Sequence, residues 1–305
     1  MRYRELGKSG IDVSVVGFGT WAIGGTDWGR VDDGDSVKAI RRAIDLGVTL
    51  FDTAPIYGNG RAESVLGRAL GAARKDVVVA TKCGPVEGPG GLAIDLSPAG
   101  IRGQLEGSLR RLGTDWVDVL QVHWPDPAWP VEEAVTAMLP LVKEGKVRAI
   151  GVSNFDAGEV RRAAAVAPIA SLQPRYSLLE RAVEDEVLPA CAELGVGVIA
   201  YEPLCRGLLT GKYDERARFD PADIRAGDER FHGEELPRRL ATVRLVSAAA
   251  RREGVTTAQM AIAWVVSQAG VTSAICGAKT ATQAAENARA GDVEMDRETA
   301  RRLAS

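Results

Sequence analysis

The chain has few of the residues that usually bind metals or form disulfides. Its 305 residues include two histidines and four cysteines. The cysteines lie far apart with no C-x-x-C spacing: Cys83, Cys191, Cys205 and Cys276. These numbers argue against a zinc site or a dithiol redox pair. We therefore expect no metal, and reduced thiols of the kind found in cytoplasmic proteins.

The sequence also lacks an excess of positive charge and long apolar stretches. Lys and Arg together number 38 against 41 Asp and Glu, which gives a formal net charge of −3. This balance argues against nucleic acid or an anionic membrane as a partner. No run of about 18 apolar residues is present, and the first ten residues lack the apolar core of a secretory signal. We expect a cytoplasmic location without a membrane span.

Short apolar runs instead alternate with amphipathic stretches along the whole chain. The apolar runs predict strands at 15–18, 50–53, 77–81, 117–122, 148–152, 171–173, 196–201 and 273–276. The amphipathic stretches predict helices at 35–45, 63–70, 98–112, 131–144, 156–165, 184–194, 237–253, 257–267 and 282–290. Eight strand-then-helix units favour a closed (β/α)8 TIM barrel over an open doubly wound sheet.

The remaining segments complete this α/β architecture as one domain over residues 1–305. The stretch 3–13 predicts an N-terminal β-hairpin before the first barrel strand. A C-terminal helix over 291–304 is expected to pack outside the barrel. The segment 207–236 is long and highly charged. Because it follows the seventh strand, it is expected to lie on the catalytic face of a barrel.

Four titratable side chains follow three neighbouring strands at the barrel's carboxyl end. Asp52 and Tyr57 follow the second strand, Lys82 the third and His123 the fourth. Each one alone has an ordinary explanation, such as a turn cap or a solvated strand end. Together they form the kind of cluster that catalysis requires, because active sites of such barrels lie at this end.

The types of these residues suggest proton donation to a developing alkoxide. Tyrosine has an unperturbed pKa near 10. A lysine ammonium about 4 Å away contributes about 4 kcal/mol at an effective dielectric of 20, or roughly three pKa units. We therefore expect Lys82 to lower the pKa of Tyr57 towards 7, where a general acid works best. Asp52 would hold Lys82 in place, and His123 would donate a hydrogen bond to a substrate carbonyl.

Hydride transfer to a carbonyl needs a cofactor, yet no G-x-G-x-x-G motif follows a strand. Gly17-Phe18-Gly19 is too short to count as one. A nicotinamide cofactor would therefore have to be bound by a different structural element.

Several longer motifs resemble the aldo-keto reductase superfamily over essentially the whole chain. They are GFGTWAIGG (17–25), GVTLFDTAPIYGNGRAESVLGRAL (47–70), VATKCG (79–84), LGTDWVDVLQVHWPDP (112–127), VKEGKVRAIGVSNF (142–155), QPRYSLLER (173–181), VIAYEPLCRGLLTGKY (198–213) and GAKTATQAAEN (277–287). The chain looks most like the bacterial branch related to potassium-channel β-subunits and inositol-locus reductases. The resemblance implies NADPH-dependent, reversible reduction of an aldehyde or ketone, an oxidoreductase reaction on CH–OH and carbonyl groups. Its catalytic tetrad falls on Asp52, Tyr57, Lys82 and His123.

The resemblance also implies a cofactor extended across the barrel mouth, with NADP(H) preferred over NAD(H). Nicotinamide contacts fall on Ser153, Asn154 and Gln173, with Tyr201 stacked on the ring, and Lys279 falls at the adenosine 2′-phosphate. The other implied cofactor residues are Gly19, Thr20, Trp21, Asp52, Glu202, Pro203, Leu204, Gly207, Leu208, Thr210, Lys212, Gly277, Gln283, Glu286 and Asn287. Three positions depart from the family pattern: Cys276 stands where relatives commonly have a proline, Glu202 replaces a small residue and Lys279 a more usual arginine.

The substrate implied is a small carbonyl compound bound by Trp21, Tyr57, His123 and Trp124. Trp21 and Trp124 either line an apolar pocket or merely pack at the rim. Two further functions stay open. One is an NADP-binding, redox-sensing regulatory subunit with slow turnover. The other is a Schiff-base lyase with Lys82 as nucleophile, which would need a neutral lysine.

Overall fold

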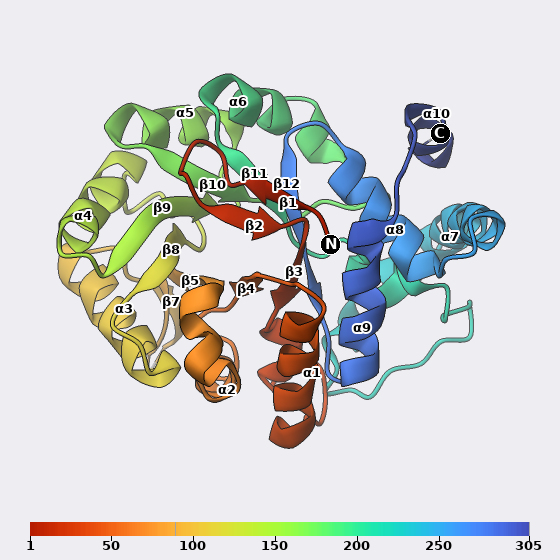
Figure 1. Ribbon diagram of the computed structural model, residues 1–305, viewed down its shortest axis with the longest axis horizontal. Coiled ribbons are helices and arrows are strands. Elements are labelled where there is room, and N and C mark those ends of the chain that lie inside the picture. Colours follow the sequence, from red (N-terminus) through yellow and green to blue (C-terminus); the bar gives the residue numbers. More distant parts are fainter. Residues whose placement is uncertain (89, 305) are drawn as a thin grey trace.

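The computed structural model describes residues 1–88 and 90–304, and within them eight parallel strands close into a barrel. Going round the barrel the order is β3-β4-β5-β8-β9-β10-β11-β12 (Figure 1). The bounds are β3 Val16–Gly19, β4 Leu50–Asp52, β5 Val78–Cys83, β8 Val117–Val122, β9 Val147–Ser153, β10 Ile169–Gln173, β11 Gly197–Ala200 and β12 Val271–Gly277. The predicted (β/α)8 barrel is confirmed, and the open sheet is excluded.

Helices surround the barrel and cover the outer faces of its strands (Figure 1). They are α1 Asp33–Asp45, α2 Arg61–Leu70, α3 Pro98–Leu112, α4 Val131–Lys143, α5 Ala157–Val166, α6 Val187–Leu194, α7 Glu235–Arg252, α8 Thr257–Ser267 and α9 Ala281–Arg289. Local signals set the ends of α3. The Ser97 side chain accepts a hydrogen bond from Gly100 N, Pro98 occupies the first turn, and Gly113 ends the helix in the left-handed conformation.

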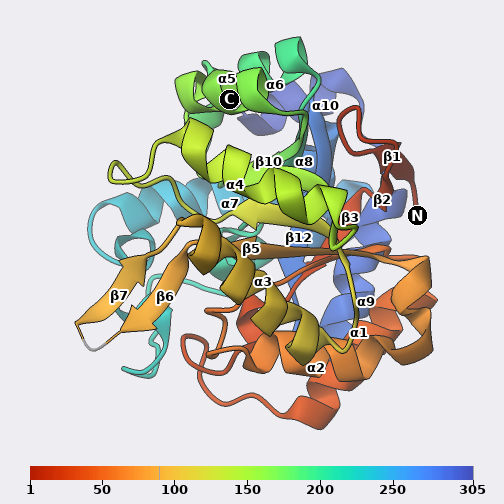
Figure 2. The same ribbon diagram turned by 90° about the vertical axis from the view of Figure 1, so that its left-hand side faces the viewer.

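The two ends of the barrel carry different additions (Figure 2). The hairpin of β1 (Tyr3–Glu5) and β2 (Asp12–Ser14) closes the amino end. Its Leu6, Ile11 and Val13 pack against the side chains that fill the barrel interior. A second hairpin, β6 (Pro85–Gly88) and β7 (Gly91–Ile94), follows β5 and projects from the carboxyl end. The sequence pattern did not predict this second hairpin.

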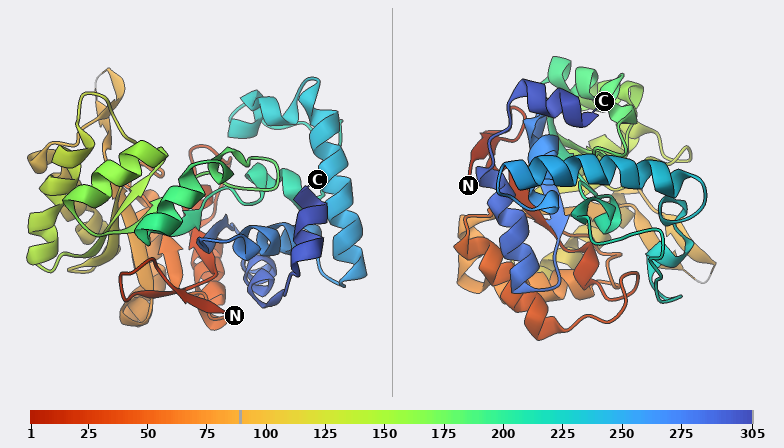
Figure 3. Two further views of the ribbon diagram at one scale, coloured as in Figure 1. Left: turned by 90° about the horizontal axis from the view of Figure 1, so that it is seen from above. Right: turned by 90° about the vertical axis from the view of Figure 1, so that its right-hand side faces the viewer.

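The segment after β11 is built from short 3-10 turns rather than a featureless loop. They are η4 (Cys205–Thr210), η5 (Ile224–Gly227) and η6 (Glu229–Phe231). This segment runs along the outside of the molecule towards the turn η1 (Trp21–Ile23), as the views in Figure 3 show. Ile224 N donates a hydrogen bond to Asp27 O at 2.8 Å, which fastens the two loops together. Shorter turns also lie at η2 (Gly71–Asp76), η3 (Ala182–Glu184) and η7 (Ala290–Asp292).

The predicted C-terminal helix over 291–304 is correct in kind but wrong in its start. The helix α10 spans Arg297–Ala304, and η7 ends before it. Arg2 explains the gap, because its guanidinium donates hydrogen bonds to the carbonyls of Gly291 at 2.9 Å and Val293 at 3.0 Å. Those carbonyls are thus engaged by the N-terminal residues. No helix in the described residues is both long and apolar enough to cross a membrane. The single domain over 1–305, whose residues 89 and 305 lie outside the description, stays a prediction.

Candidate active site

A buried ion pair lies at the carboxyl end of two adjacent barrel strands. Asp52 is the last residue of β4 and Lys82 lies near the end of β5, and both are almost fully buried. Lys82 Nζ donates to Asp52 Oδ1 at 2.6 Å and to the Thr53 carbonyl at 2.9 Å. Burial lowers the pKa of Lys82, and the adjacent Asp52 carboxylate opposes that shift.

Two amide side chains complete the surroundings of Asp52. Its other oxygen, Oδ2, accepts hydrogen bonds from Gln173 Nε2 at 2.7 Å and from Gln121 Nε2 at 3.3 Å. The sequence placed Gln173 against the nicotinamide, whereas here its amide nitrogen binds the carboxylate. Gln121 was missed, although a detectable signal exists. It follows Val117 and Val119 at the inward-facing positions of β8, so its polar group had to find a partner inside the barrel.

Tyr57 reaches this ion pair from the loop after β4. Lys82 Nζ donates to its phenol oxygen at 3.3 Å. The following residue, Gly58, has φ +59, and a Cβ there would lie 2.0 Å from Gly24 O. Only glycine permits this close approach between the Tyr57 loop and the loop after β3. The sequence therefore fixes the loop that carries the phenol.

The expected lowering of the Tyr57 pKa is wrong for this cofactor-free structure. The phenol oxygen lies in the interior, and burial together with the Asp52 charge raises the pKa of Tyr57 well above 10. The sequence argument counted the Lys82 ammonium alone. Asp52, at 2.6 Å from that ammonium, offsets its field, so desolvation dominates. Tyr57 thus stays a protonated phenol.

His123 faces Tyr57 from the end of β8 and is also buried, with 5% of its surface exposed. The two rings meet edge to face with centroids 5.9 Å apart. Burial, aided by the Lys82 charge, lowers the pKa of His123 well below 6.5. The imidazole is therefore neutral near neutral pH.

The residues predicted to hold the nicotinamide gather beside this cluster, but several bind one another. Tyr201 Oη donates to Asn154 Oδ1 at 2.9 Å, and Asn154 Nδ2 donates to His123 O at 2.9 Å. Ser153 Oγ donates to Gln173 O at 2.8 Å. Arg175 lies over the Tyr201 ring at 5.7 Å. A carboxamide at this place would have to exchange with some of these bonds.

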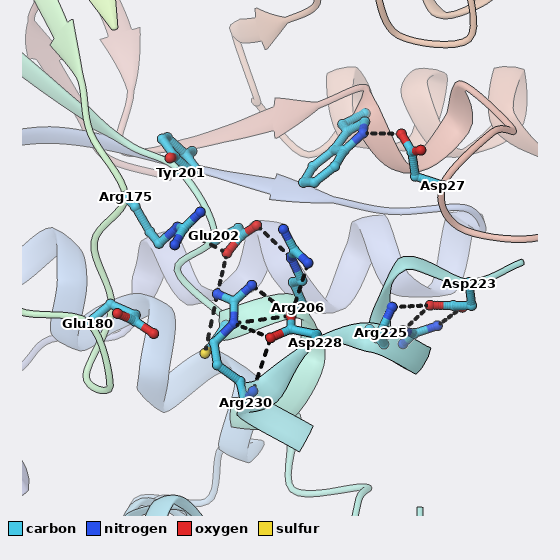
Figure 4. A network of polar contacts seen from close by, with 12 residues as sticks. Asp27, Arg175, Glu180, Tyr201, Glu202, Arg206, Asp223, Arg225, Asp228 and Arg230 are labelled. Carbon is cyan, nitrogen blue, oxygen red and sulfur yellow. Dashed lines mark hydrogen bonds and ion pairs between the residues drawn. The ribbon is translucent and has the colours of Figure 1, made fainter. Parts of the chain in front are cut away.

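The Glu202 side chain takes part in a buried ion network (Figure 4). Its carboxylate meets Arg206 Nε at 2.9 Å, Arg230 Nη1 at 2.6 Å and Arg175 Nε at 3.4 Å. Asp228 binds both Arg206 and Arg230 as well. The Glu202 carboxylate is thus engaged by three arginines. The sequence did not predict this network.

The segment that follows contains further residues predicted to contact the cofactor. Thr210 Oγ1 donates to Gly207 O at 2.6 Å, and Lys212 lies over the Tyr213 ring at 4.9 Å. Leu208 is fully buried. The other residues in this part are Pro203 and Leu204.

The far end of the predicted cofactor path carries positive charge. Lys279 Nζ donates to the Trp28 carbonyl, and the Lys279 amide donates to Gln283 Oε1 at 2.8 Å. The charges of Arg225 and Lys212 lower the pKa of Lys279, although burial lowers it more. An ammonium among further cations, just before the N-terminus of α9, suits a phosphate group.

Beside Gln283, α9 carries two further residues predicted to contact the cofactor, Glu286 and Asn287. Asn287 Nδ2 donates to Gly277 O at 3.2 Å, which ties the helix to β12. Glu286 lines a surface groove of about 490 Å³ with Thr256, Gln259 and Thr282. The two predicted residues therefore differ in setting, because Asn287 is buried and Glu286 borders the groove.

Between these two ends the predicted cofactor path passes two paired glycines and a buried hydroxyl. Gly19 and Gly277 pair across β3 and β12, and a Cβ on Gly277 would lie 3.2 Å from Ala22 Cβ. Next to them the Thr20 hydroxyl is buried and, among the described residues, has no hydrogen-bond partner. Trp21 lies parallel to the Tyr57 ring at 6.2 Å, at the catalytic end.

Comparison with known proteins decides the family. A profile of the aldo/keto reductase family matches residues 15–305. The chain belongs to the aldo/keto reductase family. It is 41% identical to aldo-keto reductase YhdN of Bacillus subtilis (strain 168) over 282 residues, 92% of this chain and 85% of the relative. It is 35% identical to the NADH-specific methylglyoxal reductase of Escherichia coli (strain K12) over 311 residues, 97% and 95% of the two chains.

A solved structure supports the same assignment. The glycerol dehydrogenase of Gluconobacter oxydans superposes with a TM-score of 0.90 at 36% identity, covering 99% of this chain and 93% of that one. This aldo/keto reductase is therefore an oxidoreductase-family protein that shares its fold with carbonyl-reducing and alcohol-oxidising relatives.

Proposed function

We propose that this aldo/keto reductase reduces an aldehyde or ketone to the alcohol, reversibly, and prefers NADP(H) over NAD(H). The substrate is a small carbonyl compound, bound near Trp21, Tyr57, His123 and Trp124. We include a cytoplasmic location in the proposal, because the four cysteines are all free, buried thiols.

The observation that carries the proposal is that the Lys82 ammonium binds both Asp52 and Tyr57. Its Nζ binds Asp52 at 2.6 Å and Tyr57 at 3.3 Å, so a buried ion pair holds a phenol oxygen at the barrel mouth. This arrangement does not suit a Schiff-base nucleophile, because the ion pair with Asp52 favours the charged form of the lysine.

Four residues of the site have separate roles in the proton transfer. His123 is neutral and donates a hydrogen bond to the carbonyl oxygen, which polarises the carbonyl. Tyr57 gives its proton to that oxygen as negative charge develops there. A raised pKa does not prevent this transfer, because an alkoxide is a much stronger base than a phenolate. Lys82 stabilises the phenolate that remains, and Asp52 holds Lys82 in place. A bound nicotinamide would supply the hydride.

The proposed preference for NADP(H) rests on the cations around Lys279, at the end of the predicted cofactor path away from Tyr57. Lys279 and Lys212, with Arg225 on η5, surround the place expected for the 2′-phosphate, against one nearby carboxylate, Asp223. Asp223 binds Arg225 at 2.5 Å, so two of the three cations remain to attract a phosphate. The E. coli relative is named as NADH-specific, so both cofactors belong in the test.

The experiment measures oxidation of NADPH and NADH by purified protein over a panel of aldehydes, ketones and sugars. The proposal expects turnover on at least one carbonyl, faster with NADPH, and turnover about 100- to 10,000-fold lower in Tyr57→Phe. Tight NADPH binding without turnover on the whole panel would support the redox-sensing subunit instead. Borohydride trapping of a carbonyl substrate on Lys82 would support the lyase.

A further inference from the structure

The two rings that follow β8 are stacked face to face. The His123 imidazole and the Trp124 indole lie 3.9 Å apart between centroids and only 5° from parallel. Trp124 is 37% exposed, whereas His123 is 5% exposed. The indole therefore covers one face of the imidazole and turns part of its own surface to solvent. Aromatic stacking at this distance removes water from the covered ring face.

The buried Nδ1 atom of His123 has no nearby acceptor, among the described residues, to which a protonated ring could donate a hydrogen bond. Its Nδ1 atom is shielded from solvent and makes no hydrogen bond with any described residue. An imidazolium carries N–H groups on both nitrogens, so protonation would bury an unsatisfied N–H here. Leaving the Nδ1 lone pair without a donor costs less free energy than burying an N–H without an acceptor, because unpaired buried N–H groups are the rarer case in proteins. The geometry thus favours the neutral tautomer with its proton on Nε2.

We propose that Trp124 is a positioning residue, which holds His123 as the neutral Nε2–H tautomer by covering its face and excluding water from Nδ1. The inference rests on the proposed role of His123 as hydrogen-bond donor to the carbonyl. It gives Trp124 a task apart from lining a substrate pocket. The uncovered indole surface remains available to a substrate.

The groups around His123 are consistent with this assignment. From β5, the Lys82 ammonium disfavours a second positive charge, and Asp52 on β4 is already paired with that ammonium. From the next loop, Tyr57 presents its ring edge. The backbone amide of His123 donates to Cys83 O at 2.9 Å, and its carbonyl accepts from Asn154. Of these groups, the Lys82 charge opposes imidazolium directly, and Trp124 keeps out the water that would stabilise it.

The test is NMR titration of the histidine side chains in cofactor-free protein, because the chain has only His123 and His232. His232 is exposed and serves as the internal reference, assigned with His232→Asn. In the wild type, His123 is expected to show Nε2–H nitrogen shifts and no titration from pH 5 to 8. In Trp124→Ala its pKa is expected to rise, so that the ring titrates within this pH range. This readout needs no turnover, so it fails or succeeds independently of the proposed function.

Two further variants separate stacking from folding damage. Trp124→Phe keeps an aromatic face and is expected to keep His123 neutral over the same range. Trp129→Ala removes a tryptophan from the same loop and is expected to leave the His123 titration unchanged. The kcat/KM profile of Trp124→Ala should gain an ionisation between pH 5 and 8 that the wild type lacks. A His123 that stays neutral to pH 5 in folded Trp124→Ala, or that titrates equally in Trp129→Ala, would overturn the proposal.

Discussion

Replacing Lys82 by methionine tests how much the buried Asp52 carboxylate lowers the free energy of unfolding when it loses its ion-pair partner. The Lys82 and Asp52 side chains are 0% and 2% exposed, so the variant leaves a carboxylate inside the barrel. Removing one partner of a buried pair costs about 3–5 kcal/mol. Gln173 and Gln121 still donate to Asp52 Oδ2, which favours the lower end of that range. For a chain of this length, ~3 kcal/mol lowers Tm by roughly 5 °C.

The assay is urea unfolding, followed by circular dichroism, of the wild type and four variants: Lys82→Met, Asp52→Asn, Lys82→Met/Asp52→Asn and Lys38→Met. Lys82→Met is compared with Lys38→Met, which breaks the exposed Lys38–Asp35 pair and is expected to leave the free energy of unfolding nearly unchanged. The double variant Lys82→Met/Asp52→Asn removes both buried charges. It is expected to regain part of the loss, with a coupling energy of about 0.5–3 kcal/mol. Equal losses for Lys82→Met and Lys38→Met, or a strictly additive double variant, would refute the reasoning.

Two further predictions, one on cofactor binding and one on cysteine reactivity, follow from the charge of Lys279 and the burial of the thiols. Lys279→Ala is expected to weaken NADPH binding more than NADH binding in fluorescence titrations, with exposed Lys38→Ala as control; equal weakening of both cofactors would mean that the 2′-phosphate binds elsewhere. All four cysteines are buried, and burial raises the pKa of Cys83 to about 12 and of Cys205 to about 11. A thiol-exchange reagent at pH 8 should therefore modify almost no cysteine in the folded protein and all four after unfolding. Rapid modification of Cys83 with loss of activity would contradict this.

The sequence was informative where a local signal determined the structure. Ser97, Pro98 and Gly113 mark the ends of α3, because a cap, a first-turn proline and a left-handed glycine act within a few residues. Lys82 stood out as a charged residue at the end of an apolar strand, where it needs a partner. The hairpin β6–β7 was missed because its glycine-rich sequence shows no alternation of apolar and polar residues.

The failures concern quantities that depend on distant side chains. Spacing brings Lys82 close to Tyr57 but does not say that Asp52 offsets the ammonium, so the direction of the Tyr57 pKa shift was wrong. The contact of Gln173 with Asp52 was not predicted, because it joins strands 121 residues apart in the sequence. The network of Glu202 likewise joins arginines from three separate segments.

The central claim is that Tyr57 gives a proton to a carbonyl that receives a hydride in this site. The most direct measurement uses NADPH with deuterium at both C4 positions and a carbonyl substrate found in the panel. It follows the label in the alcohol for the wild type and Tyr57→Phe. The account predicts deuterium on the former carbonyl carbon, a turnover about 100- to 10,000-fold lower in Tyr57→Phe, and NADPH binding that is nearly unchanged. Label transfer at the wild-type rate in Tyr57→Phe would contradict it.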